Sequence, residues 1–263
     1  MQLQKKPLAP LCLVWLLLAA MPASAALEAQ QILKKSDEVR NPDRSFSLVT
    51  TLISYKNGKQ NDTSKLVLYS RASPNGGQFR SLLRCISPQR DAGKLTLKSG
   101  RDLWLYDPAS QASVPISPQQ RLLGQASNGD VVTANWAEDY KASLVAEEQI
   151  QDGEKQMRDC YHLHLVATNP DAPYPSMDLW VDKNDFKSRK AEFYAVNGNL
   201  LKTTWYRRYE PALGGVRPTE AVIIDGVNAQ LVTVLRQQNF AWRDVPEAWL
   251  QRDYLAHFKD TDQ

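Results

Sequence analysis

Two of the three histidines form the pair His162-Leu163-His164, an arrangement whose chemistry could hold a metal ion. Two residues apart on a strand, both imidazole rings point to the same face of a sheet. The sequence signals no third ligand nearby, and His257 lies far away in the C-terminal tail. Two solvated histidines on the outer face of a strand explain the pattern without a metal, so we expect no metal site.

Nucleophilic catalysis has one weak candidate, Cys160 beside His162. A strand separates their Cα atoms by about 7 Å, and no third group in the sequence orients them. The sequence contains no G-x-S-x-G, H-E-x-x-H, P-loop or G-x-G-x-x-G motif. We therefore expect a protein that is not an enzyme and that carries no cofactor. An enzyme that uses the face of His162 and His164 is the alternative.

Residues 1–25 have the pattern of a secretory signal peptide. Lys5 and Lys6 precede an apolar run at 8–20, and Ala23-Ser24-Ala25 fits a small-x-small cleavage site. The apolar run is shorter than the ~20 residues that a membrane-spanning helix needs. We expect cleavage near Ala25, export of the chain, and one mature domain at residues 26–263.

The mature chain is almost neutral. Removal of Lys5 and Lys6, with no acidic residue in the same segment, lowers the formal net charge from +3 to +1. This balance, without a basic cluster, argues against a nucleic-acid partner. No second long apolar run occurs, so nothing marks the mature chain for stable membrane attachment.

Two cysteines remain after residue 25, Cys85 and Cys160. In an oxidising compartment such a pair invites a disulfide bond. The alternative is two separately buried thiols that each act as a small apolar residue. Both cysteines fall on predicted strands, and the sequence leaves the two possibilities open.

The apolar pattern predicts a mainly β protein of the α+β class. A helix at 27–40 ends at Asn41-Pro42, and beyond it the apolar period changes to two. The links are too short for crossover helices, so the strands form an antiparallel meander of about eleven or twelve strands, which should curl or close. The predicted strands are 46–55, 64–71, 80–86, 94–98, 102–106, 142–151, 156–167, 177–181, 188–196, 200–209, 216–224 and 229–240.

Residues 108–140 interrupt this meander. The segment carries three prolines and few strand formers, and we expect helical turns at 119–123 and 134–140. A connection of this length in a compact domain is usually functional or a lid. A short helix is also predicted in the tail, at 246–258.

Tryptophan is frequent in the mature chain, and the simplest role for an indole is packing with a hydrogen-bond partner. The alternative is that some indoles line an apolar cavity. Trp180 stands between Leu179 and Val181, so both faces of that strand carry apolar bulk, which indicates a sheet covered on both sides. The six tryptophans are Trp104, Trp136, Trp180, Trp205, Trp242 and Trp249.

Eight short sequence blocks occur in order along the mature chain. They are RCISPQRDAGK (84–94), DLWLYDP (102–108), ISP (116–118), EDY (138–140), DLWVD (178–182), KAEFY (190–194), GNLLKT (198–203) and RPT (217–219). Each block alone is weak, but together their order and spacing resemble the outer membrane lipoprotein-sorting protein family, whose members are LolA-like periplasmic proteins. The resemblance covers roughly residues 30–255, and the position of Cys85 and the stretch 125–132 depart from the family pattern.

The resemblance implies a half-open antiparallel β-barrel whose concave face is plugged by helices around an apolar cavity. It implies a non-catalytic periplasmic carrier of a lipid or an acylated lipoprotein, with transient membrane contact and a monomeric state. The alternative is an accessory or sensor subunit that docks on an RND-type membrane transporter or on an envelope-stress signalling protein. From strand alternation we predict the cavity lining as Leu68, Leu82, Leu103, Leu105, Leu179, Phe193 and Trp205.

Overall fold

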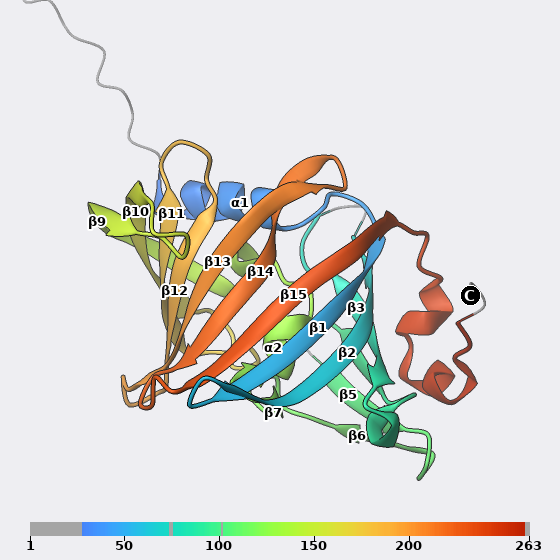
Figure 1. The fold of residues 1–263 in the computed structure, drawn as a ribbon. Helices are drawn as coiled ribbons and strands as arrows, with labels where there is room; N and C mark the ends of the chain where they lie inside the picture. The colour runs from blue at the N-terminus through green and yellow to red at the C-terminus, as the bar shows by residue number, and fades with distance from the viewer. Residues whose placement is uncertain (1–27, 74–75, 101, 261–263) are drawn as a thin grey trace, which may run out of the picture.

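The computed structural model describes residues 28–73, 76–100 and 102–260. The predicted signal peptide, residues 1–25, lies outside them. A single sheet of thirteen antiparallel strands dominates the fold and curls without closing into a barrel (Figure 1). In the described part of the chain, no helix is long and apolar enough to cross a membrane.

All twelve predicted strands are present, and β6 extends the sheet to thirteen. The prediction of a curled antiparallel meander is therefore confirmed. The strands are β1 (Phe46–Lys56), β2 (Lys59–Arg71), β3 (Arg80–Ser87), β4 (Leu95–Ser99), β5 (Asp102–Asp107), β6 (Ala112–Pro115), β9 (Tyr140–Gln151), β10 (Met157–Ala167), β11 (Ser176–Asp182), β12 (Ser188–Tyr194), β13 (Leu200–Ala212), β14 (Gly215–Asp225) and β15 (Leu231–Trp242).

The order of the strands is β6-β5-β4-β3-β2-β1-β15-β14-β13-β12-β11-β10-β9. Two meanders therefore meet in the middle of the sheet, where β1 pairs with β15, and their outer strands β6 and β9 form the two edges. Hairpin turns set this order; Asn57 and Gly58 both have positive φ, as a two-residue hairpin requires. The chain must pass from one edge of the sheet to the other between β6 and β9.

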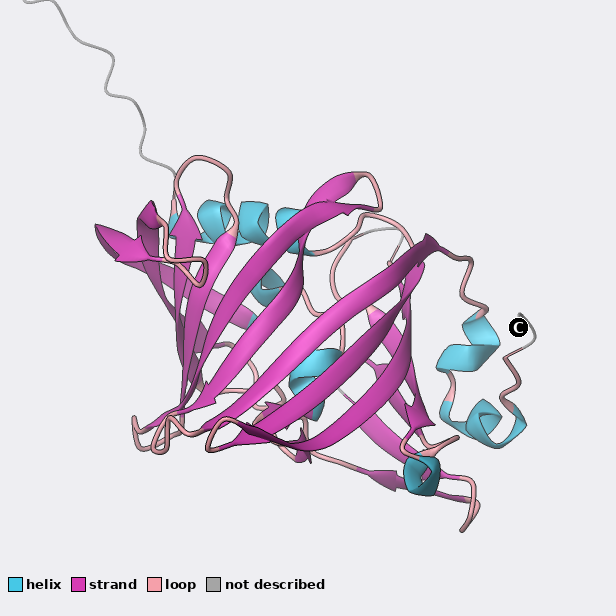
Figure 2. Cartoon of the chain, viewed as in Figure 1, coloured by secondary structure: helices cyan, strands magenta, loops and turns pink. Residues whose placement is uncertain are grey.

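That passage runs across the concave side of the sheet. It contains the small hairpin of β7 (Arg121–Leu123) and β8 (Ala126–Ser127), then α2 (Asn128–Val131) and α3 (Trp136–Asp139). Figure 2 shows α2 inside the curl. We call residues 121–135 the cover.

The helical turn predicted at 119–123 is wrong, whereas α3 confirms the turn predicted at 134–140. Gly124 explains the difference, because its positive φ turns β7 back onto β8. A side chain at this position would clash with Thr233 and Ser54 on the inner wall. The sequence signals a break at Gly124 but not the wall against which it packs.

Helix α1 (Ala29–Arg40) covers the other part of the concave side, over the strands β9–β12 (Figure 1). It begins and ends close to the predicted bounds. Ile32 and Leu33 are fully buried against Leu163, Leu179 and the other members of one apolar cluster. Two adjacent apolar residues on a single helical face thus seal this half of the sheet.

The convex side is covered in one place by the C-terminal segment, at the right of Figure 1. Trp249 and Leu255 pack there against Tyr69, Leu82 and Leu97. The predicted tail helix is in fact two short 3-10 helices, η2 (Glu247–Leu250) and η3 (Arg252–His257); a third, η1 (Gln89–Asp91), follows β3.

Candidate functional site

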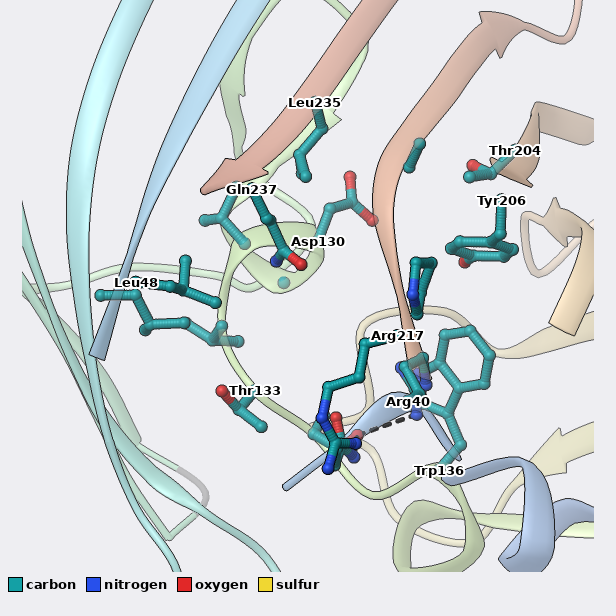
Figure 3. Close-up of a pocket in the computed structure, with 18 of the residues that line it drawn as sticks. Arg40, Leu48, Asp130, Thr133, Trp136, Thr204, Tyr206, Arg217, Leu235 and Gln237 are labelled. Atoms are coloured by element: carbon teal, nitrogen blue, oxygen red, sulfur yellow. Dashed lines mark hydrogen bonds between the residues drawn. The ribbon is translucent and has the colours of Figure 1, made fainter. Parts of the chain in front are cut away.

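A cavity of about 120 Å³ lies on the concave side between the sheet and the cover. Its wall is formed by β1, β2 and β12–β15, and α2 and the end of α1 close it (Figure 3). Alternation along the strands places apolar side chains on this inner face. The apolar part of the lining is Phe46, Leu48, Leu68, Val131, Val132, Trp136, Phe193, Ala221, Ile223, Leu235 and Phe240.

A larger cavity of about 460 Å³ lies on the other side of α2. Val131 of α2 lines both cavities, so this short helix separates them. Leu66 and Leu83 contribute apolar wall to the second cavity, and charged residues such as Arg90 and Asp91 also line it. The concave side therefore holds two neighbouring compartments on either side of α2.

The cover is attached to the wall both by apolar residues, such as Ala126 and Val131, and by polar contacts. Asp130 forms an ion pair with Lys202 of β13 and accepts a hydrogen bond of 3.0 Å from the Tyr174 hydroxyl. Thr133 shares a buried hydroxyl–hydroxyl hydrogen bond with Ser70 of β2. Burial and the nearby Asp130 carboxylate raise the pKa of Tyr174 well above its ordinary value, which keeps this donor protonated.

The end of the cavity beside α1 carries two arginines, Arg40 and Arg217 (Figure 3). Arg40 lies over the Trp136 ring, with its Cζ 3.5 Å from the ring centroid. Its Nη2 also donates to Asp37 and, over 2.9 Å, to the Ala134 carbonyl. The lining is thus amphipathic, apolar along the strands and cationic at one end.

Two of the seven predicted lining residues, Leu68 and Phe193, line the first cavity. Leu103 and Leu105 face the same side of the sheet but line neighbouring pockets. Leu179 also faces inward, where it is packed within the apolar cluster under α1.

Leu82 and Trp205 lie on the opposite, convex face. Leu82 packs under the C-terminal segment, while its neighbour Leu83 pairs with Leu68 on the inner face. Trp205 pairs across the strands with Lys190, whose Nζ lies 5.4 Å from the indole centroid. Alternation could not separate Leu82 from Leu83, because both are buried, one on each face.

The polar residues at the site were not predicted. Arg217 falls within the RPT block and Asp130 within the unusual stretch 125–132, but neither was assigned a role. Arg40 ends the predicted helix, where a cation ordinarily serves the helix dipole. Arg40, Asp130 and Arg217 come from α1, α2 and β14, three elements that only the folded structure brings together.

The histidine pair lies on the convex face, away from the cavity. The His164 Nδ1 atom is 2.7 Å from the Asp178 carboxylate, and His162 stacks on Trp180 with ring centroids 4.3 Å apart. No group of three or more His, Cys, Asp or Glu side chains within residues 28–73, 76–100 and 102–260 could hold a metal ion.

Cys85 and Cys160 are both buried and free, so the disulfide is not formed in this structure. Cys85 is on β3 and Cys160 on β10, with seven strands between them in the sheet. Burial raises the pKa of both thiols, that of Cys160 to about 12. Each therefore acts as a small core residue, the second of the two roles considered from the sequence.

Three solved structures share this architecture over most of the chain. A LolA superfamily protein from Nitrosomonas europaea is 33% identical, with a TM-score of 0.77, and the match covers 87% of this chain and 100% of that one. A putative outer membrane lipoprotein-sorting protein domain from Vibrio parahaemolyticus has 20% identity, a TM-score of 0.72 and coverages of 87% and 98%. A DUF1329 family protein from Desulfovibrio piger has 21% identity, a TM-score of 0.73 and coverages of 86% and 97%.

A family model described as "-like: Uncharacterized protein" matches residues 77–257. A search of curated proteins finds no match. The two relatives at about 20% identity support the fold, and the Nitrosomonas protein, matched along its whole length, supports the family as well. The curled sheet, the cover and these matches agree: the chain belongs to the LolA superfamily.

Proposed function

We propose that the protein is a periplasmic carrier that holds an acyl chain of a lipid or a lipoprotein on its concave face and passes it towards the outer membrane. The observation that carries this proposal is an apolar wall closed by a short cover, with cavities of about 120 and 460 Å³ on either side of α2. The names of the relatives, LolA superfamily and lipoprotein sorting, support the same reading. A signal peptide at 1–25 would supply the export that this role needs.

The size of the cavity indicates how the ligand enters. A space of about 120 Å³ is similar to one that admits a single benzene ring, which is too small for a long acyl chain. Displacement of α2 would join it to the neighbouring cavity of about 460 Å³. We therefore infer that this is the closed form of the proposed carrier, which would load its ligand when the cover moves.

Extraction of the purified protein and mass spectrometry of the extract test the proposal, together with uptake of a fluorescent fatty acid. We expect co-purified lipid and saturable uptake, because each CH₂ group buried contributes ~0.8 kcal/mol. A Leu68→Trp variant, which fills the wall of the first cavity, should lose uptake. Val227→Trp is the control, because Val227 is 94% exposed. If the unmodified protein carries no bound lipid and takes up no fatty acid, the proposal is overturned.

A further inference from the structure

At the cationic end of the first cavity, Arg40 forms an ion pair with Asp37, whereas Arg217 forms none within the described residues. Arg217 is only 6% exposed, and its hydrogen bonds within the described residues all go to backbone carbonyl oxygens. These are the carbonyls of Glu38 and Val39 in the last turn of α1, and those of Ala212 and Leu213 at the β13–β14 turn. Carbonyl oxygens carry partial charges and do not neutralise a guanidinium.

Arg40 stands next to Val39, whose carbonyl oxygen is 2.9 Å from Nη1 of Arg217. The Nε atom of Arg40 is buried and has no hydrogen-bond partner among the described residues. Its carboxylate partner, Asp37, also accepts a 2.8 Å hydrogen bond from the backbone N–H of Ala137. A buried N–H without an acceptor is costly, about 1–3 kcal/mol.

The acidic side chains that line the first cavity, Asp130 and Glu220, are already engaged. Asp130 pairs with Lys202, and the Glu220 side chain turns to the convex face, where Arg207 and Arg236 bind it. Asp43 acts on Arg217 only at a distance, and burial lowers the pKa of that guanidinium from its ordinary value. An anion from outside the chain would complete this end of the cavity.

The position of Arg217 also suits a head group at an entrance. Arg217, Asn41 and Pro42 line both the inner cavity and an outer polar groove of about 760 Å³. A ligand could place a charged head between the groove and the cavity while its chain followed the apolar wall. Leu48 and Leu235 lie further along that wall (Figure 3).

We propose that Arg40 and Arg217 bind the anionic head group of a single-chain or two-chain amphiphile, either a carboxylate or a phosphate, whose acyl chain lies along the strands. This inference rests on the proposed carrier function and narrows its ligand. A guanidinium binds either head group through charge-assisted hydrogen bonds, here from the N–H groups that the backbone carbonyls leave free, whereas an uncharged acyl ester offers only a weak acceptor. The cargo selected by this cavity is therefore an anionic lipid rather than any acylated molecule.

Competition against a bound fluorescent fatty acid tests the head group on the unmodified full-length mature protein. The competitors are palmitate, hexadecyl phosphate and methyl palmitate, which share a chain of the same length. We expect the two anions to bind at least about tenfold more tightly than the ester, the effect of one charge-assisted hydrogen bond. Equal affinity of all three would overturn the inference while leaving the carrier function intact, and failure of all three would count against the carrier function itself.

Inorganic phosphate and acetate are added as competitors without a chain. If either of them displaces the fluorescent fatty acid at the same concentration as its long-chain counterpart, the site binds free anions. That result would overturn the inference that the ligand is an amphiphile. The ratio of palmitate to hexadecyl phosphate affinity distinguishes the two head groups.

Variants assign the effect to the arginines. Arg217→Met and Arg40→Met should each lower palmitate affinity about tenfold and leave methyl palmitate affinity unchanged. Arg252→Met is the matched control, because Arg252 stacks on Trp104 of the convex face. Arg217 also ties α1 to β14, so Arg217→Lys, which keeps the charge, is the second variant and should recover part of the palmitate affinity. If both methionine variants keep the wild-type preference for palmitate over methyl palmitate, the head group is not bound by Arg40 and Arg217.

Discussion

The two halves of the concave face are closed in different ways. Over β9–β12, the twelve-residue helix α1 buries Ile32 and Leu33 completely in an apolar cluster. Over β1–β3 and β13–β15, the four-residue helix α2 and its flanking segments leave cavities of about 120 and 460 Å³. Under the proposed carrier function, the α1 half is a fixed plug and the α2 half is the opening.

The contacts in each half give this difference an energetic basis. Removing apolar surface from water contributes roughly 25 cal/mol per Å². Helix α1 has such a packed apolar face and adds polar contacts such as the Ser36–Ser188 hydrogen bond. A polar contact exchanges with water when it opens, so its net contribution is only about 0.5–1.5 kcal/mol. The cover is held by Asp130 and Thr133 and by the buried residues Ala126 and Val131, but its helix is short and has a cavity on each side. We therefore expect it to open more readily than α1.

The largest expected effect is a loss of stability in the α1 half. Ile32→Ala should lower the free energy of unfolding by about 2–5 kcal/mol, because the packed cluster cannot fill the space left. Val131→Ala, in the cover, should cost only about 1–2 kcal/mol, because two methyl groups are lost beside an existing cavity. Urea unfolding of both variants measures the contrast, and equal losses would remove the distinction between plug and cover.

A covalent lock on the cover tests whether it must open. In the Ser70→Cys/Thr133→Cys variant, the new thiols replace two hydroxyl groups that are in direct contact. We expect the oxidised protein to take up a fluorescent fatty acid at least about tenfold more slowly, and a reductant to restore the rate. Each single variant is a control. Unchanged uptake by the locked protein would show that the ligand enters without movement of residue 133.

The smallest effect concerns the wall behind the cavity. Glu220 is buried on the convex face, 2.5 Å from Arg207 and 2.8 Å from Arg236. Burial alone would raise the pKa of this carboxyl, but the hydrogen bonds from Arg236 and Arg207 outweigh it and lower the pKa below the ordinary 4.5. The ionised form is thus favoured in the folded state, and its contribution is present above pH 4.5 and lost as the pH falls through the lowered pKa.

Glu220→Gln should therefore reduce stability at pH 7 by about 1 kcal/mol, since the arginines remain partly solvated. Urea unfolding at a series of pH values from 7 to 3 should show the two proteins converging at the acidic end. Fatty-acid uptake at pH 7 should not change if the wall stays fixed while the cover moves. A stability difference that is constant across this range would show that the charge of Glu220 is not its source.

Local pattern was enough to place the elements of the sheet. Alternation and turn residues such as Asn57-Gly58 located twelve of its thirteen strands, and the Asn41-Pro42 break located the end of α1. The missing strand, β6, is short and ends at Pro115, so its sequence has little strand character. Strand positions follow from neighbouring residues, which is why they could be predicted without an alignment.

The site depends on longer-range relations that no local pattern contains. Leu82 and Leu83 are equally apolar, and only the pairing of β3 with β2 decides that Leu83 faces Leu68. Arg217 looks like an ordinary surface cation in the sequence. It is buried because the end of α1 and the β13–β14 turn, far apart in the chain, surround it with carbonyl groups.

The pairing of β1 with β15 has a consequence for how the protein folds. These strands are the first and last of the sheet in the chain, so their ladder cannot form until nearly all of the described chain is available. Contacts between such distant segments form slowly, because the entropy cost of closing a long loop comes before the contacts can stabilise the chain. Until this pairing forms, each half-sheet would expose part of its inner apolar face to water. Pairing of β1 with β15 is therefore the step that joins the two half-sheets into one curled sheet and completes the wall of the first cavity.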